Sequence, residues 1–327
     1  MPSSREQILH WAEQGHIRDG NLLDALRAAE ALPGAAQWRR FVDRLLLWLG
    51  AVSVGVGVIF FFAYNWDALG RFGKFALVQA PILVCLLALW RTGLDTLAGK
   101  AAVLIASLLV GALFALIGQT YQTGADTYQL FAVWAAAILP WALLARLPAL
   151  WVLWLALVHL AFWLYLRHFG FGRWWSELGA EQRLLPHALL DMAALVLWEL
   201  GARHGLRWLE GRWAPRLIAT AAGCVLTWMY LFWIVDDEPG QRSIMLVWPL
   251  WLFASTAFYL LIRRDLYILS GLMLALIVVV TTAFGVWLFR NHVEFFGGLA
   301  LIGLVIIGMS AAAAIWLRRL AQGESRA

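Results

Sequence analysis

The chain has 327 residues, of which 63% are hydrophobic and only 14% are charged. A water-soluble domain carries roughly 25% charged residues, so this composition excludes a soluble globular protein and predicts an all-α integral membrane protein. The net charge of +5 comes from arginines spread one or two to a loop. That spread favours orientation in a lipid bilayer over a nucleic-acid-binding face.

Residues 1–40 are polar and predict a small cytoplasmic head of two short helices. The tetrapeptide that begins at Ser4 has capping-box spacing and predicts a helix that ends at Gly15. A second helix is expected from Asn21 to Leu32. The head has no hydrophobic signal region or cleavage site, so we expect the first apolar helix to insert as its own uncleaved signal. The head either packs on the membrane bundle as a collar or binds a partner protein.

Ten apolar segments follow and predict about ten transmembrane helices, because a helix needs roughly 20 apolar residues to cross a bilayer. We place them near residues 44–63, 75–90, 100–117, 127–145, 148–166, 185–202, 214–235, 244–262, 266–288 and 294–316. They form a predicted bundle over residues 41–318, followed by a short cytoplasmic tail at 319–327. The bundle divides into halves of five helices, about 44–166 and 185–316, which is the arrangement of many inverted-repeat transporters.

The basic residues predict which side of the membrane each loop faces. Cytoplasmic loops of membrane proteins carry an excess of Lys and Arg. With the head inside, seven of the 25 basic residues lie outside: Arg71, Lys74, Arg167, Arg173, Arg183, Arg242 and Arg290. The other 18 (25 − 7) lie inside. We therefore expect a multi-pass protein with both termini in the cytoplasm.

Small residues at helical spacing predict close contacts between helices. The first span has two interleaved pairs, Ala51 with Gly55 and Ser53 with Gly57, and Gly303 and Gly308 recur on the last span. Small side chains let helix backbones approach each other within lipid. We interpret these positions as packing sites.

Two polar stretches interrupt the apolar pattern on the predicted outer side. One ends the first span, and the other is a break over residues 118–126 between the third and fourth spans. Their amides, hydroxyls and carboxylates suit a polar headgroup, a sugar or a hydrated cation. The candidate outer site comprises Asn65, Asp67, Lys74, Gln119, Tyr121, Gln122 and Asp126. The alternative is structural: interfacial aromatic anchors, snorkelling basic residues, and a loop in which Gly118 and Gly124 form turns and Asp126 caps the next helix.

Ionisable residues within the predicted spans form a second set of candidates. His159 lies in the fifth span and Asp191 in the sixth. A charge at the bilayer centre costs roughly 2.5–3.5 kcal/mol, so such residues face a partner or water. These two residues would suit a proton relay or a cation site. Glu199, nearer the cytoplasmic end, is expected to pair with Arg203 four residues on.

Signatures of known enzymes are absent from the sequence. There is no nucleophile elbow, no zinc-binding HExxH, no phosphate-binding loop and no dinucleotide fingerprint. Cys85 and Cys224 lack the spacing of a metal site. We therefore expect no catalytic residues, no cofactor and no metal.

Several motifs of the first 150 residues resemble one family of bacterial inner-membrane proteins. They are a Gly15-His16-Ile17 turn, the segment from Ala63 to Asp67, Lys74, the break at 118–126, Leu130-Phe131 and Trp134. The resemblance is to the family called domain of unknown function 2157. It implies a location in the bacterial inner membrane, and it implies no activity, substrate or cofactor.

Three functions are compatible with these patterns. The first is a transporter or flippase of a small polar or amphiphilic solute, with ion coupling as one form of it. The second is a non-catalytic membrane subunit or sensor that binds a partner membrane protein through its head. The third is a membrane enzyme that acts on a lipid-linked substrate, with Asp67 or Asp126 as its acid or base. Ten spans that carry only a few polar groups, at specific positions, favour the transporter or flippase.

Overall fold

The computed structural model describes residues 4–17, 19–29, 34–64, 70–122, 124–169, 182–236 and 242–324. Within these ranges every regular element is a helix and no strand occurs. The predicted all-α fold is therefore confirmed. Asn65 and Asp67 of the candidate outer site lie outside the described residues.

The head consists of α1 (Ser4–Glu13), a short 3₁₀ turn η1 (Asp19–Asn21) and α2 (Leu22–Ala28). The first helix begins at the predicted residue. The second is described only to Ala28, and residues 30–33 of its predicted range lie outside the described part. Ile8 and Leu26 are buried, and α1 packs against α2. One apolar residue from each helix thus forms the small interior of the head.

Among the residues that the structure describes, ten helices are long and apolar enough to cross a membrane, as predicted. The first five are α3 (Ala35–Tyr64), α4 (Arg71–Thr92), α5 (Leu97–Tyr121), α6 (Thr127–Ala145) and α7 (Pro148–Phe169). The next five are α9 (Leu185–Arg203), α10 (Trp213–Asp236), α11 (Arg242–Ala257), α12 (Leu266–Arg290) and α13 (Phe295–Glu324). The 3₁₀ turns η3 (Gln182–Leu184) and η4 (Arg207–Leu209) flank α9, and α11 continues into the π-helical turn η6 (Phe258–Ile262).

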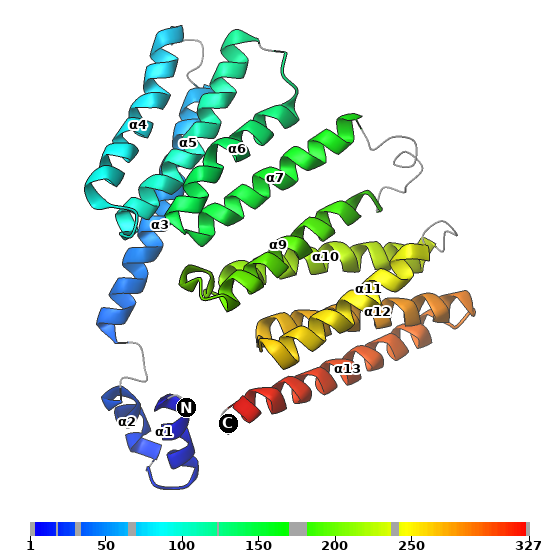
Figure 1. Cartoon of the computed structure of the whole chain (residues 1–327). Coiled ribbons are helices and arrows are strands. Elements are labelled where there is room, and N and C mark those ends of the chain that lie inside the picture. Colours follow the sequence, from blue (N-terminus) through cyan, green and yellow to red (C-terminus); the bar gives the residue numbers. More distant parts are fainter. Residues whose placement is uncertain are drawn as a thin grey trace. The chain divides into compact units, whose positions relative to one another are not determined.

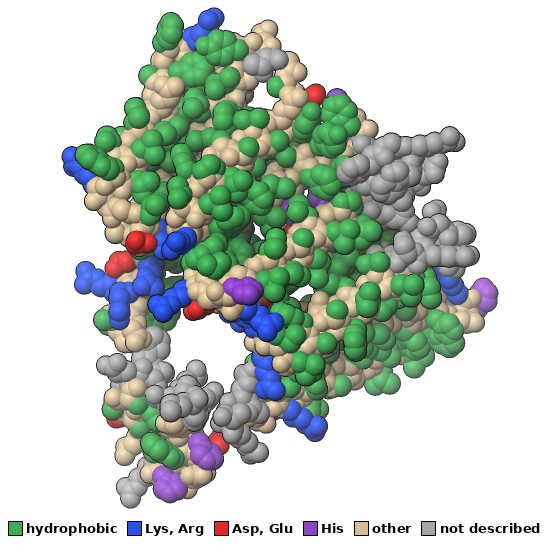
Figure 2. Space-filling model, viewed as in Figure 1, with side chains coloured by type: hydrophobic (Ala, Val, Ile, Leu, Met, Phe, Trp, Pro, Cys, Tyr) green, Lys and Arg blue, Asp and Glu red, His purple; other side chains and the backbone are tan. Residues whose placement is uncertain are grey.

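Hydrophobic side chains cover the flanks of these helices on the face seen in Figure 2. Large exposed residues include Phe60, Trp90, Leu144, Phe253 and Phe296. Water would not tolerate so much apolar surface, whereas lipid does. The chain is therefore a polytopic membrane protein.

The contacts between helices divide the chain into two compact units. One comprises residues 33–173 and contains α3 to α7. The other comprises residues 1–32 together with 174–327 and contains the head and α9 to α13 (Figure 1). Each unit thus holds five of the ten candidate spans.

In the unit of α3–α7, small residues allow large ones to close the helix interfaces. A Cβ on Gly111 would lie 2.4 Å from the ring of Trp134, so only glycine fits beneath this indole. The Trp134 Nε1–H donates a hydrogen bond of 2.7 Å to the carbonyl oxygen of Ser107. Gly55 faces Leu108 of α5 in the same way, with Leu108 Cδ1 2.9 Å from an added Cβ. The predicted packing role of Gly55 is confirmed.

In the unit of α9–α13, the core gathers on α10. Ala188, Leu226, Trp248 and Val279 form its buried centre, and α9, α11 and α12 all pack against α10. By contrast, nothing lies within 4 Å of a Cβ added at Gly303 or Gly308. The same is true of Gly57 on α3. The prediction that these three glycines mark helix contacts is wrong for the part of the chain that the structure describes. Gly285 of α12 instead faces α13.

Candidate functional site

The residues predicted to form an outer site fall in two places. Tyr121, in the last turn of α5, stacks near Phe75 of α4, with 6.0 Å between ring centroids. Lys74 immediately precedes Phe75, so these two members of the set lie on neighbouring helices that pack together. A single site that also includes Asn65 and Asp67 stays a prediction.

The polar break between the third and fourth spans is shorter than predicted. The helix α5 continues through Gly118 and Gln119 to Tyr121, and Gln122 ends it in the left-handed conformation with φ of 44°. Gly124 turns the chain with φ of +65°. Gly118 does not form a turn, because it lies within α5. Gln119 and Tyr121 are therefore helical residues rather than loop residues.

Asp126 is directed toward α7 rather than toward the backbone of α6. It occupies the position before α6, but its side chain makes no capping hydrogen bond. Its Oδ1 lies 3.9 Å from His168 Nε2, and an open pocket lies between it, Tyr128 and Arg167. The capping role predicted for Asp126 is wrong in this structure.

The two predicted intramembrane residues lie in different units. His159 is on α7, and the buried Asp191 is on α9. Their pairing as a proton relay stays a prediction. Asp191 immediately precedes Met192, which lines the largest cavity described below.

Sequence reasoning missed a group of charged residues that the structure brings together where four helices of one unit end or begin. This charge cluster consists of Glu199, Arg212, Arg216, Arg263 and Asp265. Glu199 is near the end of α9, the first two arginines flank the start of α10, Arg263 follows η6, and Asp265 precedes α12. The cluster thus links the C-terminal ends of α9 and η6 to the N-terminal ends of α10 and α12.

Glu199 is held by two guanidinium groups rather than by Arg203. Its Oε1 accepts a hydrogen bond of 2.8 Å from Arg212 Nη1, and its Oε2 forms an ion pair of 2.8 Å with Arg263 Nη1. The hydroxyl of Tyr259 donates a further bond of 3.3 Å to Oε1. The expected pairing with Arg203 is wrong, because residues distant in sequence fold over the end of α9 and occupy both oxygens.

Asp265 connects the cluster to α12. Its Oδ2 accepts hydrogen bonds from Arg212 Nε at 2.7 Å and from Arg216 Nε at 3.1 Å. Its Oδ1 accepts from the backbone N–H groups of Tyr267 and Ile268. It therefore caps the first turn of α12 while it neutralises arginines of α10.

Both carboxylates are almost fully removed from solvent, with side-chain exposures of 3% for Glu199 and 1% for Asp265. A buried charge persists only when it is paired and hydrogen-bonded. Burial alone would raise the pKa of Asp265, but hydrogen bonds from Arg216 and Arg212 outweigh it and hold the pKa below the ordinary value of 3.8. Burial alone would lower the pKa of Arg212, and its hydrogen bonds to Glu199 and Asp265 raise it instead.

A cavity of about 360 Å³ lies between α9, α10, α11 and α12. Its wall is mostly apolar. The polar side chains among its lining residues are Thr220, Cys224, Thr227, Ser255 and Tyr259. Ligand pockets have volumes of roughly 300–1,000 Å³ and combine apolar walls with a few polar groups, so this cavity has the properties of a binding site.

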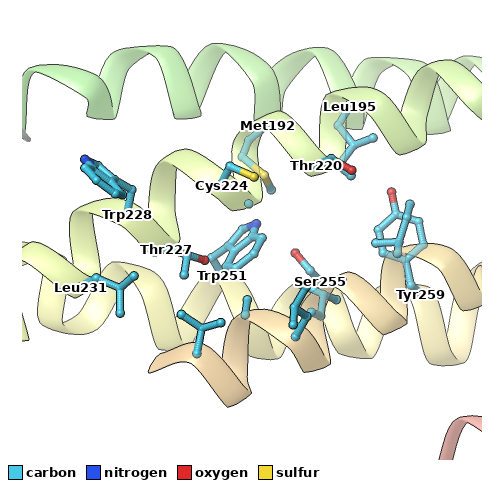
Figure 3. Close-up of a pocket in the computed structure, with 18 residues that line it drawn as sticks. Met192, Leu195, Thr220, Cys224, Thr227, Trp228, Leu231, Trp251, Ser255 and Tyr259 are labelled. Atoms are coloured by element: carbon cyan, nitrogen blue, oxygen red, sulfur yellow. The ribbon is translucent and has the colours of Figure 1, made fainter. Parts of the chain in front are cut away.

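Figure 3 shows how the side chains lie in this cavity. Trp251 and Ser255 of α11 point into the same space as Thr227 of α10, and Tyr259 lies at the opposite end from Trp228. Gly223 makes room for Trp251, whose ring would lie 3.3 Å from an added Cβ. The cavity is thus bordered by the indole of Trp228 at one end and by the phenol of Tyr259 at the other.

A second cavity of about 240 Å³ adjoins the first between α9 and α11. The two share lining residues, namely Met192, Leu195, Ser255 and Tyr259. Glu199 lines the second cavity and belongs to the charge cluster. An apolar space therefore ends at a set of buried charges, which is the arrangement that accommodates a molecule with an apolar body and a polar end.

Two features of the sequence point to individual members of this cluster, although not to the cluster itself. Asp265 is an isolated acidic residue between two adjacent arginines and an apolar run, and Glu199 is an acidic residue inside a span. An acidic residue before a helix predicts an N-cap. Nothing in the sequence assigns Arg212 and Arg216, which follow Glu199 by 13 and 17 positions, as its neighbours in space.

The helices and their apolar surfaces define the class of this protein as an all-α polytopic membrane protein. Residues 9–151 match the family described as Predicted membrane protein (DUF2157). This match confirms the resemblance drawn from the motifs. It extends from the head into α7, so the charge cluster and both cavities lie outside it. No curated protein and no solved structure matches the chain.

Proposed function

We propose that this protein is a transporter or flippase of a small amphiphile and that the cavity between α9, α10, α11 and α12 is its binding site. The observation that carries the proposal is the continuity of an apolar cavity with buried charges inside candidate membrane spans. An amphiphile dissolved in the bilayer would place its apolar part among Leu195, Trp251 and Leu272 and its polar part toward Tyr259 and Glu199.

The gap between α9 and α11 supports entry from the bilayer. Both helices pack against α10, and the second cavity lies between them. Val196 and Leu200 of α9 line this cavity and are more than one-third exposed. A lateral opening of this kind would admit a lipid-like molecule without requiring it to pass through water.

Proteoliposomes test this proposal. A fluorescent single-chain amphiphile is incorporated in both leaflets, and a membrane-impermeant quencher reports how fast the inner pool reaches the outside. We expect exchange faster than in protein-free liposomes. Ala275 lines the cavity on α12, so Ala275→Trp should fill the cavity and stop the exchange. Val280→Trp, on the same helix but outside the cavity lining, is the matched control and should not. Wild-type exchange no faster than in protein-free liposomes would contradict the proposal.

The orientation in a bacterial inner membrane belongs to the same proposal. With the head in the cytoplasm, Arg212, Arg216 and Arg263 lie on the inner side, in agreement with the excess of basic residues expected there. The charge cluster would then mark the cytoplasmic end of the cavity. A fluorescent-protein fusion at the C-terminus should be bright and an alkaline phosphatase fusion inactive, and the reverse result would invert the orientation.

A role as a partner-binding subunit is the second candidate, and the head favours it. Trp11 and Leu23 are 50% and 60% exposed on α1 and α2, so large apolar side chains remain after the two helices pack together. Affinity purification with and without residues 1–32 tests this role. A stoichiometric partner that disappears with the head would support it, and amphiphile exchange that persists without the head would separate it from the first proposal.

A further inference from the structure

The larger of the two cavities has an uncharged wall. None of its described lining residues is Asp, Glu, Lys, Arg or His. An ion that leaves water for such a space loses hydration that nothing there replaces. The second cavity has one charged residue among its described lining residues, Glu199. The surroundings of this carboxylate therefore decide whether an ion can bind.

Glu199 favours neither sign of charge in a ligand. Its own negative charge would repel an anion. A cation would have to compete with two guanidinium groups, because Oε1 accepts a hydrogen bond of 2.8 Å from Arg212 and Oε2 lies 2.8 Å from Arg263 Nη1. Neither arginine is among the described lining residues of the two cavities, so neither guanidinium borders the space that an anion would occupy. The electrostatics thus favour a ligand without net charge.

The boundary between the two cavities carries two hydroxyl groups. The described residues that line both cavities are Met192, Leu195, Ser255 and Tyr259. Of these, Ser255 on α11 and Tyr259 on η6 have hydroxyl groups, and Figure 3 shows both at the cavity. The polar end of a ligand at this boundary would therefore meet hydroxyls.

Ser255 has hydrogen-bonding capacity that the described part of the protein does not use. In other spans, the hydroxyls of Ser107, Thr220 and Thr281 donate to the carbonyl oxygen four positions earlier. Ser255 makes no hydrogen bond among the described residues, and its side chain points into the cavity. A hydroxyl among apolar groups is unfavourable without a partner. Its donor and its acceptor are thus available to a ligand.

Tyr259 supplies an acceptor at the same boundary. Its hydroxyl donates its hydrogen to Glu199 Oε1 at 3.3 Å, so the oxygen keeps lone pairs for an incoming donor. A ligand hydroxyl is both a donor and an acceptor. It can therefore accept a hydrogen bond from Ser255 and donate one to Tyr259.

From these observations we infer that the site selects uncharged amphiphiles whose headgroup carries a hydroxyl, the class of long-chain alcohols and monoacylglycerols. The hydroxyl binds Ser255 and Tyr259, and the hydrocarbon tail occupies the apolar cavity. This inference deepens the proposed function and rests on it, because it names the class of solute that the same cavity accepts.

Binding measurements in phosphatidylcholine nanodiscs test the inference with four tritiated probes. Dodecanol carries a hydroxyl, tridecane carries no polar group, and dodecanoate and dodecyltrimethylammonium carry a negative and a positive charge at mildly alkaline pH. Empty nanodiscs correct for partitioning into lipid. We expect dodecanol to bind about tenfold or more tightly than either ion, because neither ion finds a countercharge. We expect it to bind about threefold or more tightly than tridecane, which forms no hydrogen bond.

Ser255→Ala is the informative variant, because it removes the ligand's partner without removing a hydrogen bond among the described residues. We expect dodecanol binding to weaken about threefold or more, with tridecane binding unchanged. Ser270→Ala is the matched control. Ser270 is exposed on α12, bonds to its own helix and is not among the described lining residues of either cavity, so its loss should leave all four affinities unchanged.

The outcomes separate this inference from the proposed function. Binding of either ion as tightly as dodecanol, or equal binding of dodecanol and tridecane, would overturn the inference and leave the cavity as an amphiphile site. Equal dodecanol affinities of the Ser255 and Ser270 variants would also overturn it, because Ser255 would then not hold the headgroup. Absence of binding by all four probes would refute the proposed function itself. The wild-type comparison decides the question if the Ser255 variant does not fold.

Discussion

Each of the two units contains a glycine that faces a tryptophan, and the two pairs have different structural effects. In the unit of α3–α7, the Trp134 ring lies directly over Gly111 and closes the interface between α5 and α6. In the other unit, Trp251 faces Gly223 at a larger distance and borders a cavity of about 360 Å³. The apolar cavity between α4, α5 and α6 is only about 170 Å³. The interface between α5 and α6 is therefore closed by tight apolar packing, whereas the other unit leaves a cavity between its helices and joins its helix ends through buried charges.

Asp265→Ala should have the largest effect, because it tests the charges that hold α10 and α12 together. Removal of one partner from a buried ionic network costs about 3–5 kcal/mol. We expect the lower end of this range, because the side chains of Arg212 and Arg216 are 21% and 41% exposed and Arg212 keeps its hydrogen bond to Glu199. Thermal unfolding of the purified protein in detergent measures the loss. Asp95→Ala, at an exposed turn, serves as the control and should change stability by less than about 0.5 kcal/mol. Equal effects of the two substitutions would show that the cluster does not hold these helices together.

Gly111→Ala should have the next largest effect, in the tightly packed unit. Its new methyl group would lie 2.4 Å from the Trp134 ring, and overpacking of this kind costs about 1–3 kcal/mol. Gly118→Ala, in the same helix with nothing within 4 Å, should instead be neutral or gain up to about 1 kcal/mol. The same unfolding assay compares them. A Gly111 variant as stable as the wild type would mean that α5 and α6 separate easily.

Trp134→Phe keeps most of the ring but removes its hydrogen bond to the Ser107 carbonyl. We expect a loss of about 0.5–1.5 kcal/mol, the usual net contribution of one such bond. Trp90→Phe is the control, because Trp90 is 82% exposed and its substitution should leave the unfolding temperature unchanged. If the two variants behaved alike, the 2.7 Å bond would contribute nothing measurable.

Moderate acidification should have the smallest effect. The pKa of Asp265 is depressed in the folded protein from an ordinary value of 3.8, so its stabilising contribution is complete above that value and declines only as pH falls through the lower, folded pKa. The stability difference between wild type and Asp265→Asn should thus stay constant from neutral pH down to about pH 5 and shrink only below 3.8. Unfolding temperatures of both proteins across this range provide the test, and a difference that shrank already near pH 6 would contradict it.

The spans were predictable because lipid imposes a strong requirement on sequence. A helix must present about 20 apolar residues to cross the bilayer, and each of the ten predicted segments coincides with a helix of the structure. Even the short segment near 75–90 proved to be part of a helix of 22 residues. The sequence rules for helix termination predicted the ends of the helices less accurately. The side chains around Gly118 permitted either a turn or a continued helix, and α5 continued.

The cavity and the charge cluster were not predictable, because they depend on which helices become neighbours. Glu199 had a partner available at Arg203 by spacing alone, but the fold supplies Arg212 and Arg263 instead. Space between helices leaves no pattern in a single sequence. The polar loops around Asp126 attracted attention because their composition is unusual, whereas Tyr259 and Ser255 look like ordinary residues of an apolar helix.

The π-helical turn η6 sets the direction in which the residues that follow α11 point. A π turn contains one residue more than the corresponding α turn, and one residue corresponds to about 100° of rotation around the axis. The backbone N–H of Arg263 accordingly bonds to the carbonyl of Phe258, five positions earlier. Insertion or deletion of a single residue here would turn the guanidinium of Arg263 away from Glu199, so the length of this turn, and not only its composition, determines whether this ion pair forms.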